Sequence, residues 1–171
     1  YTQNIRRIFA AGMSNGGMMA QRIACEMPDV VAGVVSVAAN MPAELAPQCT
    51  PQAPVAVMFI NGVQDPIVPY AGGEIKILRN SRGTVLSTEA SLAFWQKQGG
   101  CTSLPDRQFT ANSSRRDYRC ERGKLRLLSV SDGGHAWPGG SPYLPGFMIG
   151  KTSEEFSASQ QIIDFILENP G

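Results

Sequence analysis

Short apolar runs alternate with stretches of helical spacing along this chain. The apolar runs have the length and composition of strands covered on both faces, and they occupy residues 8–11, 30–39, 54–60 and 125–130. Helical spacing opens near Gly16 and stops before Pro28, recurs before Gly99-Gly100, and returns in the last segment up to about Asn169. Long crossovers between the apolar runs imply a mainly parallel sheet with helices on its faces. The pattern therefore predicts the α/β class.

Parts of this pattern carry more detailed expectations. The first helix should bury a side that includes Met18, Met19, Ile23 and Ala24. The start of the last helix is ambiguous, because Thr-x-x-Glu and Ser-x-x-Gln, beginning five residues apart, both fit a capping box. Residues 101–123 are polar and irregular, so we expect an excursion from the sheet there. No linker or repeat divides the 171 residues, and we expect one domain over 1–171.

The first strand turns into the first helix through a serine flanked by glycines. Residues 12–16 read Gly-Met-Ser-Asn-Gly, the G-x-S-x-G pattern of a nucleophile elbow. A strand that turns directly into a helix strains the backbone at the serine and brings neighbouring chain close, so only residues without a Cβ should fit. The turn would lift the Ser14 hydroxyl above the sheet edge and leave the Asn15 N–H to hold an oxyanion. The alternative is a glycine-rich turn with an incidental serine.

Two further strand ends carry the partners that a nucleophilic serine needs. Asp65 follows the third apolar run, and His135, the one histidine of the chain, follows the fourth. A serine hydroxyl needs an imidazole to take its proton and a carboxylate to orient that imidazole. The chain order Ser, Asp, His is the order used by α/β-hydrolases. We therefore predict Ser14, Asp65 and His135 as a catalytic triad.

Two other aspartates are rivals for the acid. Asp132 lies in the same tight turn as His135 and would struggle to approach its Nδ1 atom. Asp29 follows a helix, which should place it at the opposite end of the sheet.

Composition excludes several classes of function. A net charge of +1 and short, scattered arginine pairs give no basis for a nucleic acid or an acidic surface as partner. No apolar run approaches the roughly 18 residues needed to cross a bilayer, so we expect no membrane span. With one histidine and no C-x-x-C spacing, we expect neither a metal nor a cofactor.

Four cysteines indicate the compartment. Their neighbourhood in the sequence predicts the disulfides Cys25–Cys49 and Cys101–Cys120. Each would close a loop of roughly 20–25 residues and contribute about 3 kcal/mol in the chain-entropy model. Disulfides predict a secreted or extracytoplasmic protein. The alternative is four reduced, buried cysteines in a cytosolic protein.

Three motifs follow one another in the order of a known family. They are 12–17 (Gly-Met-Ser-Asn-Gly-Gly), 65–73 (Asp-Pro-Ile-Val-Pro-Tyr-x-Gly-Gly) and 133–140 (Gly-Gly-His-Ala-Trp-Pro-Gly-Gly). They resemble the polyhydroxybutyrate depolymerase / feruloyl esterase-like α/β-hydrolases, and the likeness runs over nearly all of the chain. One departure is Asn61-Gly62, where relatives often have His-Gly before the acid loop.

The resemblance implies roles for individual residues. It implies Ser14 as nucleophile, Asp65 as triad acid, His135 as base, ester hydrolysis, and secreted or envelope-associated relatives. We assign Met13 and Trp137 as candidate substrate contacts. For Trp137 the alternative is packing beneath the histidine loop.

The position of the nucleophile strand adds a further expectation. In α/β-hydrolases this strand is usually about the fifth of eight, so we expect the N-terminal strands, and the loop that donates a second oxyanion N–H, to be lacking. The strand would then have an exposed apolar edge, which favours a homo-oligomer. The leading hypothesis is a serine esterase that acts through an acyl-enzyme on a small aryl or alkyl ester or a polyester. The alternatives are a serine peptidase on the same scaffold and a catalytically impaired binding domain.

Overall fold

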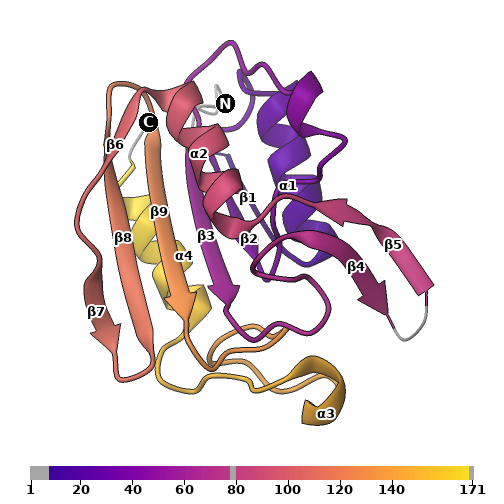
Figure 1. The fold of residues 1–171 in the computed structure, drawn as a ribbon. Coiled ribbons are helices and arrows are strands. Elements are labelled where there is room, and N and C mark those ends of the chain that lie inside the picture. Colours follow the sequence, from indigo (N-terminus) through magenta and orange to yellow (C-terminus); the bar gives the residue numbers. More distant parts are fainter. Residues whose placement is uncertain (1–7, 78–79, 170–171) are drawn as a thin grey trace, which may run out of the picture.

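Four parallel strands form the centre of the fold. The computed structural model describes residues 8–77 and 80–169 (Figure 1). Parallel pairing joins neighbours in the order β1, β2, β3, β9, and these strands span Phe9–Met13, Gly33–Val37, Ala56–Gly62 and Lys124–Val130. Every residue of β2 and β3 is buried, which explains why their sequences are apolar without alternation. Among the described residues β1 pairs with β2 alone, so its other edge has no strand partner there.

Helices cover both faces of this sheet. α1 (Asn15–Glu26) and α2 (Thr88–Gly99) pack on one face, where their small and apolar side chains meet β2, β3 and β9. α4 (Ala158–Leu167) packs on the other face through Ala158, Ile162 and Phe165. The predicted α/β class, with a mostly parallel sheet, is confirmed (Figure 1).

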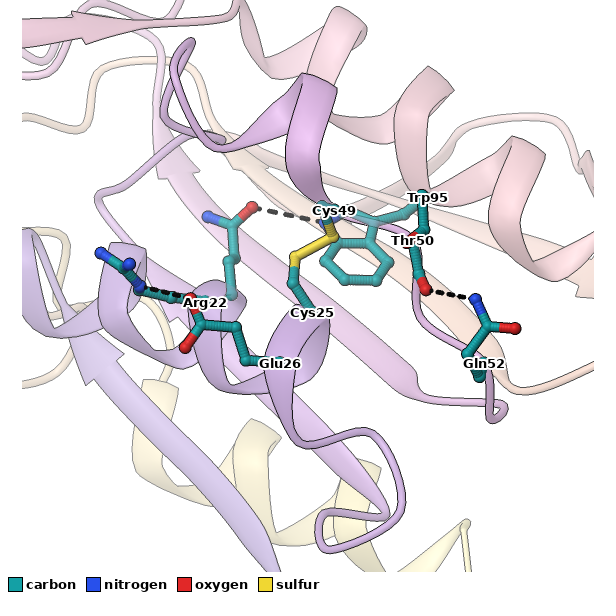
Figure 2. Close-up of a disulfide and its surroundings, with 8 residues drawn as sticks. Arg22, Cys25, Glu26, Cys49, Thr50, Gln52 and Trp95 are labelled. Carbon is teal, nitrogen blue, oxygen red and sulfur yellow. Dashed lines mark hydrogen bonds and ion pairs between the residues drawn. A yellow bond between two sulfur atoms is a disulfide. The ribbon is translucent and has the colours of Figure 1, made fainter.

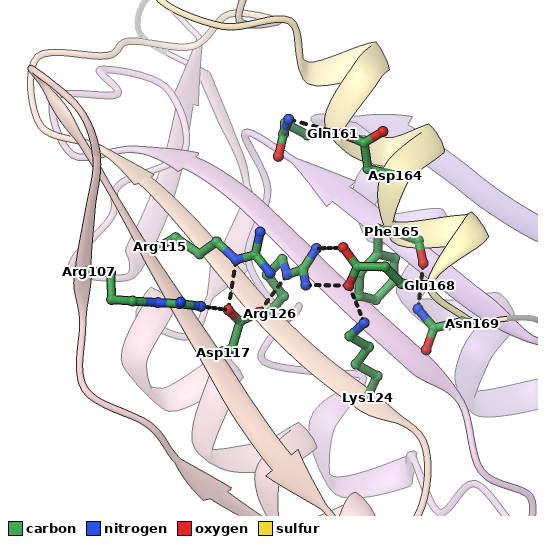
Figure 3. A network of polar contacts seen from close by, with 10 residues as sticks. All are labelled: Arg107, Arg115, Asp117, Lys124, Arg126, Gln161, Asp164, Phe165, Glu168 and Asn169. Carbon is green, nitrogen blue, oxygen red and sulfur yellow. Dashed lines mark hydrogen bonds and ion pairs between the residues drawn. The ribbon is translucent and has the colours of Figure 1, made fainter.

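Residues 101–123 do not form the irregular excursion that their polarity predicted. They contain β6 (Cys101–Ser103), β7 (Arg107–Thr110) and β8 (Ser113–Cys120), and β8 pairs antiparallel with β9. The polar side chains are compatible with strands because they pair with one another. Figure 3 shows the central group, in which Asp117 accepts hydrogen bonds from Arg107, Arg115 and Arg126.

Two helices differ in detail from their sequence patterns. In α1 the sheet-facing residues are Gly17, Ala20, Gln21 and Ala24, and Met19 is 52% exposed, so the expectation that Met19 is buried was wrong. Small residues face the sheet because α1 packs close to it. The ambiguity at the last helix is resolved in favour of Ser157, whose hydroxyl accepts from the N–H of Gln160.

A short hairpin lies outside the main sheet, and the hydrophobic pattern did not predict it. It consists of β4 (Gly73–Ile77) and β5 (Asn80–Val85). Ile75 and Val85 are its buried members, and they pack with Val68 and Met18. So few apolar positions give no visible alternation in the sequence. The described residues also form two single-turn helices, η2 (Ala46–Gln48) and α3 (Gly146–Ile149).

Both predicted disulfides are confirmed. Cys25–Cys49 ties the end of α1 to the loop after β2, and it lies beside Trp95, whose Nε1 donates to Gln21 Oε1 (Figure 2). Cys101–Cys120 ties β6 to β8. Two disulfides point to an extracellular protein. Within 8–77 and 80–169, no helix combines the length and apolar character needed to traverse a bilayer.

Candidate active site

Ser14 occupies the strained turn that the sequence predicts between β1 and α1. Its φ is 54° and its ψ is −121°, a conformation that a residue with a side chain rarely adopts. A Cβ on Gly12 would lie 2.4 Å from the backbone of Gly16, and one on Gly17 would lie 2.8 Å from Ala39. A Cβ on Gly16 would meet nothing within 4 Å, so the expectation of a steric need for glycine fails at that position.

The Ser14 hydroxyl is not used to cap its own helix. Ser87 and Ser157 hold the same position before α2 and α4, and each accepts a hydrogen bond from the third helical N–H. Ser14 makes no such bond, and its φ is positive where those of Ser87 and Ser157 are negative. The structure therefore leaves this hydroxyl without a capping role.

The N-terminus of α1 offers donors beside Ser14. The N–H of Met18 makes the bond to the Ser14 carbonyl at 3.0 Å, so the N–H groups of residues 15–17 have no acceptor within the helix. Asn15, which we predicted as the oxyanion donor, is the first of these and is exposed. Helix N-termini favour developing negative charge.

Asp65 is locked into the loop after β3. Its Oδ1 atom accepts from the N–H groups of Ile67 and Val68, both at 2.8 Å. Its Oδ2 atom lies 2.7 Å from Nδ1 of His135. Because a carboxylate is an acceptor, the ring proton belongs on Nδ1, and Nε2 keeps the lone pair that a base needs. Both side chains are almost fully buried.

A glycine contact brings the histidine loop back across the sheet. β9 lies three strands from β1, yet the turn after β9 crosses the end of β3, where Gln64 N donates to the carbonyl of Gly133. A Cβ on Gly62 would lie 2.3 Å from that same carbonyl oxygen. The His135 N–H then donates to the carbonyl of Ile149. Close packing at Gly62 thus holds His135 on the side of β9 that leads toward β1.

The structure joins two of the three predicted residues directly. Asp65 and His135 are hydrogen-bonded, whereas in the described part of the chain no hydrogen bond joins Ser14 to His135. Ser14 instead is anchored by its N–H to the Val37 carbonyl at the end of β2. All three residues follow the carboxyl ends of parallel strands, which is where α/β sheets bind ligands.

The rival acids lie elsewhere. Asp132 forms an ion pair with Lys151. Asp29 is exposed and lines a cavity at the amino ends of the strands, together with Val31, Ala56 and Glu168.

A buried network of amide and hydroxyl side chains, which we did not predict, supports the loop of residues 65–70, here called the acid loop. Asn61 Nδ2 and Thr88 Oγ1 both donate to Asn40 Oδ1 at 2.9 Å, and the three residues are at most 4% exposed. Asn40 Nδ2 donates to the Pro69 carbonyl, and the Thr88 N–H donates to the Tyr70 carbonyl. The network therefore fixes the far end of the loop that begins at Asp65. Asn61 stands where the resembled family often has histidine, and this difference was the one feature of the sequence that pointed to the network.

Met13, Trp137 and Tyr143 lie close to the predicted site residues in the sequence. Trp137 packs against the core beside α4, and its Nε1 donates to Ser159 Oγ. Its role as a substrate contact stays a prediction. Met13 ends β1 and joins the same core. The Tyr143 hydroxyl donates to the His135 carbonyl, and burial, followed by the charge of Asp65, raises the pKa of Tyr143.

The described residues contain no group of three or more histidine, cysteine, aspartate or glutamate side chains that could hold a metal ion. The site as built consists of a hydroxyl, a carboxylate–imidazole pair and helix N–H groups. This set suits acyl transfer.

Comparison with known proteins gives two relatives, while no family model matches the chain. The chain is 32% identical over 176 residues to "Putative esterase NocK" of Nocardia uniformis subsp. tsuyamanensis, an alignment that covers 94% of this chain and 51% of that protein. It is 31% identical over 134 residues to "Feruloyl esterase B" of Piromyces equi, covering 77% of this chain and 25% of that protein. These likenesses support an esterase family. The chain spans about half the length of the first relative and about a quarter of the second.

Proposed function

We propose that this chain is a serine-dependent carboxylic ester hydrolase. The observation that carries the proposal is the buried hydrogen bond between Asp65 and His135 at the ends of β3 and β9. The strained Ser14 turn supports it, because its hydroxyl is free of a capping bond and stands beside open helix N–H groups. The names of the two relatives support ester chemistry.

The proposed reaction proceeds through an acyl-enzyme. Ser14 Oγ attacks the ester carbonyl carbon while Nε2 of His135 takes the hydroxyl proton, and the Asn15 N–H helps to hold the oxyanion. The carbonyl–oxygen bond to the alcohol then breaks, and His135 returns the proton to the departing alcohol. A water molecule then attacks the acyl carbon while Nε2 of His135 takes its proton. The bond to Ser14 Oγ breaks, the carboxylic acid leaves, and His135 returns the proton to Ser14. Asp65 keeps the ring proton on Nδ1 throughout.

Fluorophosphonate labelling tests this mechanism. We expect a fluorophosphonate to label Ser14, as located by peptide mass mapping, and labelling to disappear in Ser14→Ala. Ser157→Ala, which removes a helix-capping serine, is the matched control and should label normally. A chain that stays unlabelled would support the binding-domain alternative. Faster cleavage of a peptide anilide than of a short aryl ester would support the peptidase alternative.

We also propose that the edge of β1 opposite β2, which has no strand partner among the described residues, pairs with a strand from a second copy of the chain. Ser14 lies directly after β1, so a strand added there would bring new backbone N–H groups beside the oxyanion. Light scattering tests the homo-oligomer, and a strictly monomeric species would count against it.

A further inference from the structure

We propose that a groove between α1 and the β4–β5 hairpin binds the acyl chain of the ester. The groove has a volume of about 290 Å³, at the lower limit of ordinary ligand-binding clefts. α1 contributes Asn15, Met18, Met19 and Arg22 to its lining. This spacing places them along one face of the helix. The inference rests on the proposed esterase function and assigns a substrate class to the same site.

One lining residue, Asn15, adjoins the proposed nucleophile, whereas Ser14 itself does not line the groove. Asn15 directly follows Ser14, and its N–H is the proposed oxyanion donor. Arg22 lies seven residues further along α1, which is about 10 Å at 1.5 Å per residue. A carbonyl held at Asn15 therefore has a path for its chain along the helix.

The groove has a mixed lining, with an apolar part beside α1 and a charged part around it. Met18 and Ile75 belong to the apolar part, and Ile75 is 5% exposed. Leu45 contributes from the loop after β2, and Met19 lines the groove with half of its surface open to solvent. Methionine side chains adapt to irregular apolar ligands. The charged residues Arg22, Glu44 and Arg82 also line the groove.

The hairpin wall is fixed to the acid loop. Ile75 packs with Val68, three residues after Asp65. The Lys76 N–H donates to the Ile67 carbonyl at 3.3 Å, and Val85 makes a bridge to Pro42. The groove is therefore held by the same loop that holds the triad acid.

Reaction geometry assigns the groove to the acyl part rather than to the alcohol. His135 must deliver its proton to the departing alcohol, so the alcohol lies on the side of the histidine loop. No residue of 131–150 lines the groove. The acyl chain is the part of the ester that leads away from His135.

The test compares acyl length in variants that narrow the groove. Met19→Trp and Thr84→Trp place indoles in the groove at exposed positions of α1 and β5. Each methylene buried in the native groove should raise kcat/KM for p-nitrophenyl esters roughly fourfold. We expect either variant to lower kcat/KM for the octanoate at least about tenfold and to leave the acetate within about twofold. Met27→Trp changes an exposed methionine outside the groove and should leave both values unchanged.

Two results would overturn the assignment. One is an equal loss on octanoate and acetate esters. The other is a loss that follows the length of the alcohol in a series of alkyl acetates. A binding measurement separates this proposal from the proposed chemistry, because octanoate should shift the methyl NMR signals of Met18 and Met19 even in Ser14→Ala. If Ser14 is never labelled but these signals shift, the groove assignment is supported and the esterase mechanism is wrong. If the enzyme is active but the signals do not shift, only the groove assignment is wrong.

Discussion

At the residue scale, the distinctive group is the Asp65 carboxylate, because both of its oxygens are engaged in hydrogen bonds. Asp65 accepts from two backbone N–H groups through Oδ1 and contacts the imidazole through Oδ2. The backbone bonds set the direction of the carboxylate, and that direction sets which ring nitrogen of His135 carries the proton. In the proposed mechanism, Asp65 therefore orients His135 without itself taking part in proton transfer.

Replacing Asp65 by asparagine tests that role. A side-chain amide has one acceptor oxygen where the carboxylate has two, so His135 would adopt the other tautomer. We expect Asp65→Asn to lower kcat by about 10⁴ with little change in KM. Ester hydrolysis under saturating substrate measures the effect. Asp132→Asn, which removes a neighbouring carboxylate paired with Lys151, serves as the control. A comparable loss in that variant would mean that the two aspartates had been assigned the wrong roles.

The two glycines around Ser14 predict opposite outcomes. Gly12→Ala puts a methyl group 2.4 Å from the Gly16 backbone, so the turn must deform. We expect loss of Ser14 labelling and destabilisation of about 1–3 kcal/mol. Gly16→Ala meets no atom within 4 Å, and it should leave the free energy of unfolding unreduced. Urea titration of both variants checks the pair; equal damage in both would show that the turn is not governed by this contact.

At the scale of elements, the sequence was informative where strands are buried on both sides. β2 and β3 form continuous apolar runs, and their carboxyl ends could be predicted together with Asp65. The hairpin β4–β5 and strands β6 to β8 were missed. In these elements strand formation depends on cross-strand ion pairs and on a few buried side chains, and neither leaves an apolar period in the sequence.

The site was predictable to a similar degree. Motif and strand order identified Ser14, Asp65 and His135 as candidates, because each follows a recognisable strand. The support beneath the acid loop could not be read in advance, since Asn40, Asn61 and Thr88 are far apart in the chain and only the fold brings them together. The expected burial of Met19 failed for a related reason: helical period alone does not reveal that small residues face the sheet.

A single isosteric change tests whether this network supports the acid loop. Thr88→Val keeps the shape of the side chain but removes the donor to Asn40 and an acceptor for Asn61. We expect a loss of about 1–3 kcal/mol in unfolding free energy, and a fall in kcat that exceeds any rise in KM. Thr50→Val, at an exposed position, should change stability by less than about 0.5 kcal/mol. Parallel denaturation and kinetics would contradict the idea if Thr88→Val lost stability but kept its full kcat.

At the scale of the whole molecule, a buried cation links the antiparallel half of the sheet to α4. Arg126 on β9 is 1% exposed, donates to Asp117 of β8 and to Glu168 beyond α4, and lies over the ring of Phe165 (Figure 3). Burial alone would raise the pKa of Asp117, but hydrogen bonds from Arg115 and Arg126 outweigh it and lower the pKa to about 2. A hydrogen bond from Arg126 likewise lowers the pKa of Glu168 to about 2.

These shifts predict how stability depends on acid. A carboxyl that is more acidic in the folded than in the unfolded chain stabilises the fold above its unfolded pKa, near 3.8 for Asp117, and this contribution disappears as the pH falls toward about 2. We expect Asp117→Asn to cost about 2 kcal/mol at pH 7 and to flatten the decline between about pH 4 and pH 2. Chemical denaturation across that range measures it. Asp29→Asn, on an exposed turn, should reproduce the parent curve; an unchanged slope in the Asp117 variant would contradict the assignment.

The placement of the two covalent bridges has a consequence for how the molecule fails on heating. Both disulfides lie toward the amino ends of the parallel strands, since Cys25 is in the last turn of α1 and Cys101–Cys120 joins β6 to β8. Ser14, Asp65 and His135 follow the carboxyl ends of those strands. Figure 1 shows the two ends of the sheet. The amino end of the sheet is therefore cross-linked covalently, whereas the loops at the carboxyl end are held by hydrogen bonds and close glycine contacts. Local unfolding should therefore begin at the loops that carry Ser14, Asp65 and His135. On heating, activity should be lost several degrees below the temperature at which the sheet unfolds. It should return on cooling as long as the disulfide-linked end of the sheet has stayed folded.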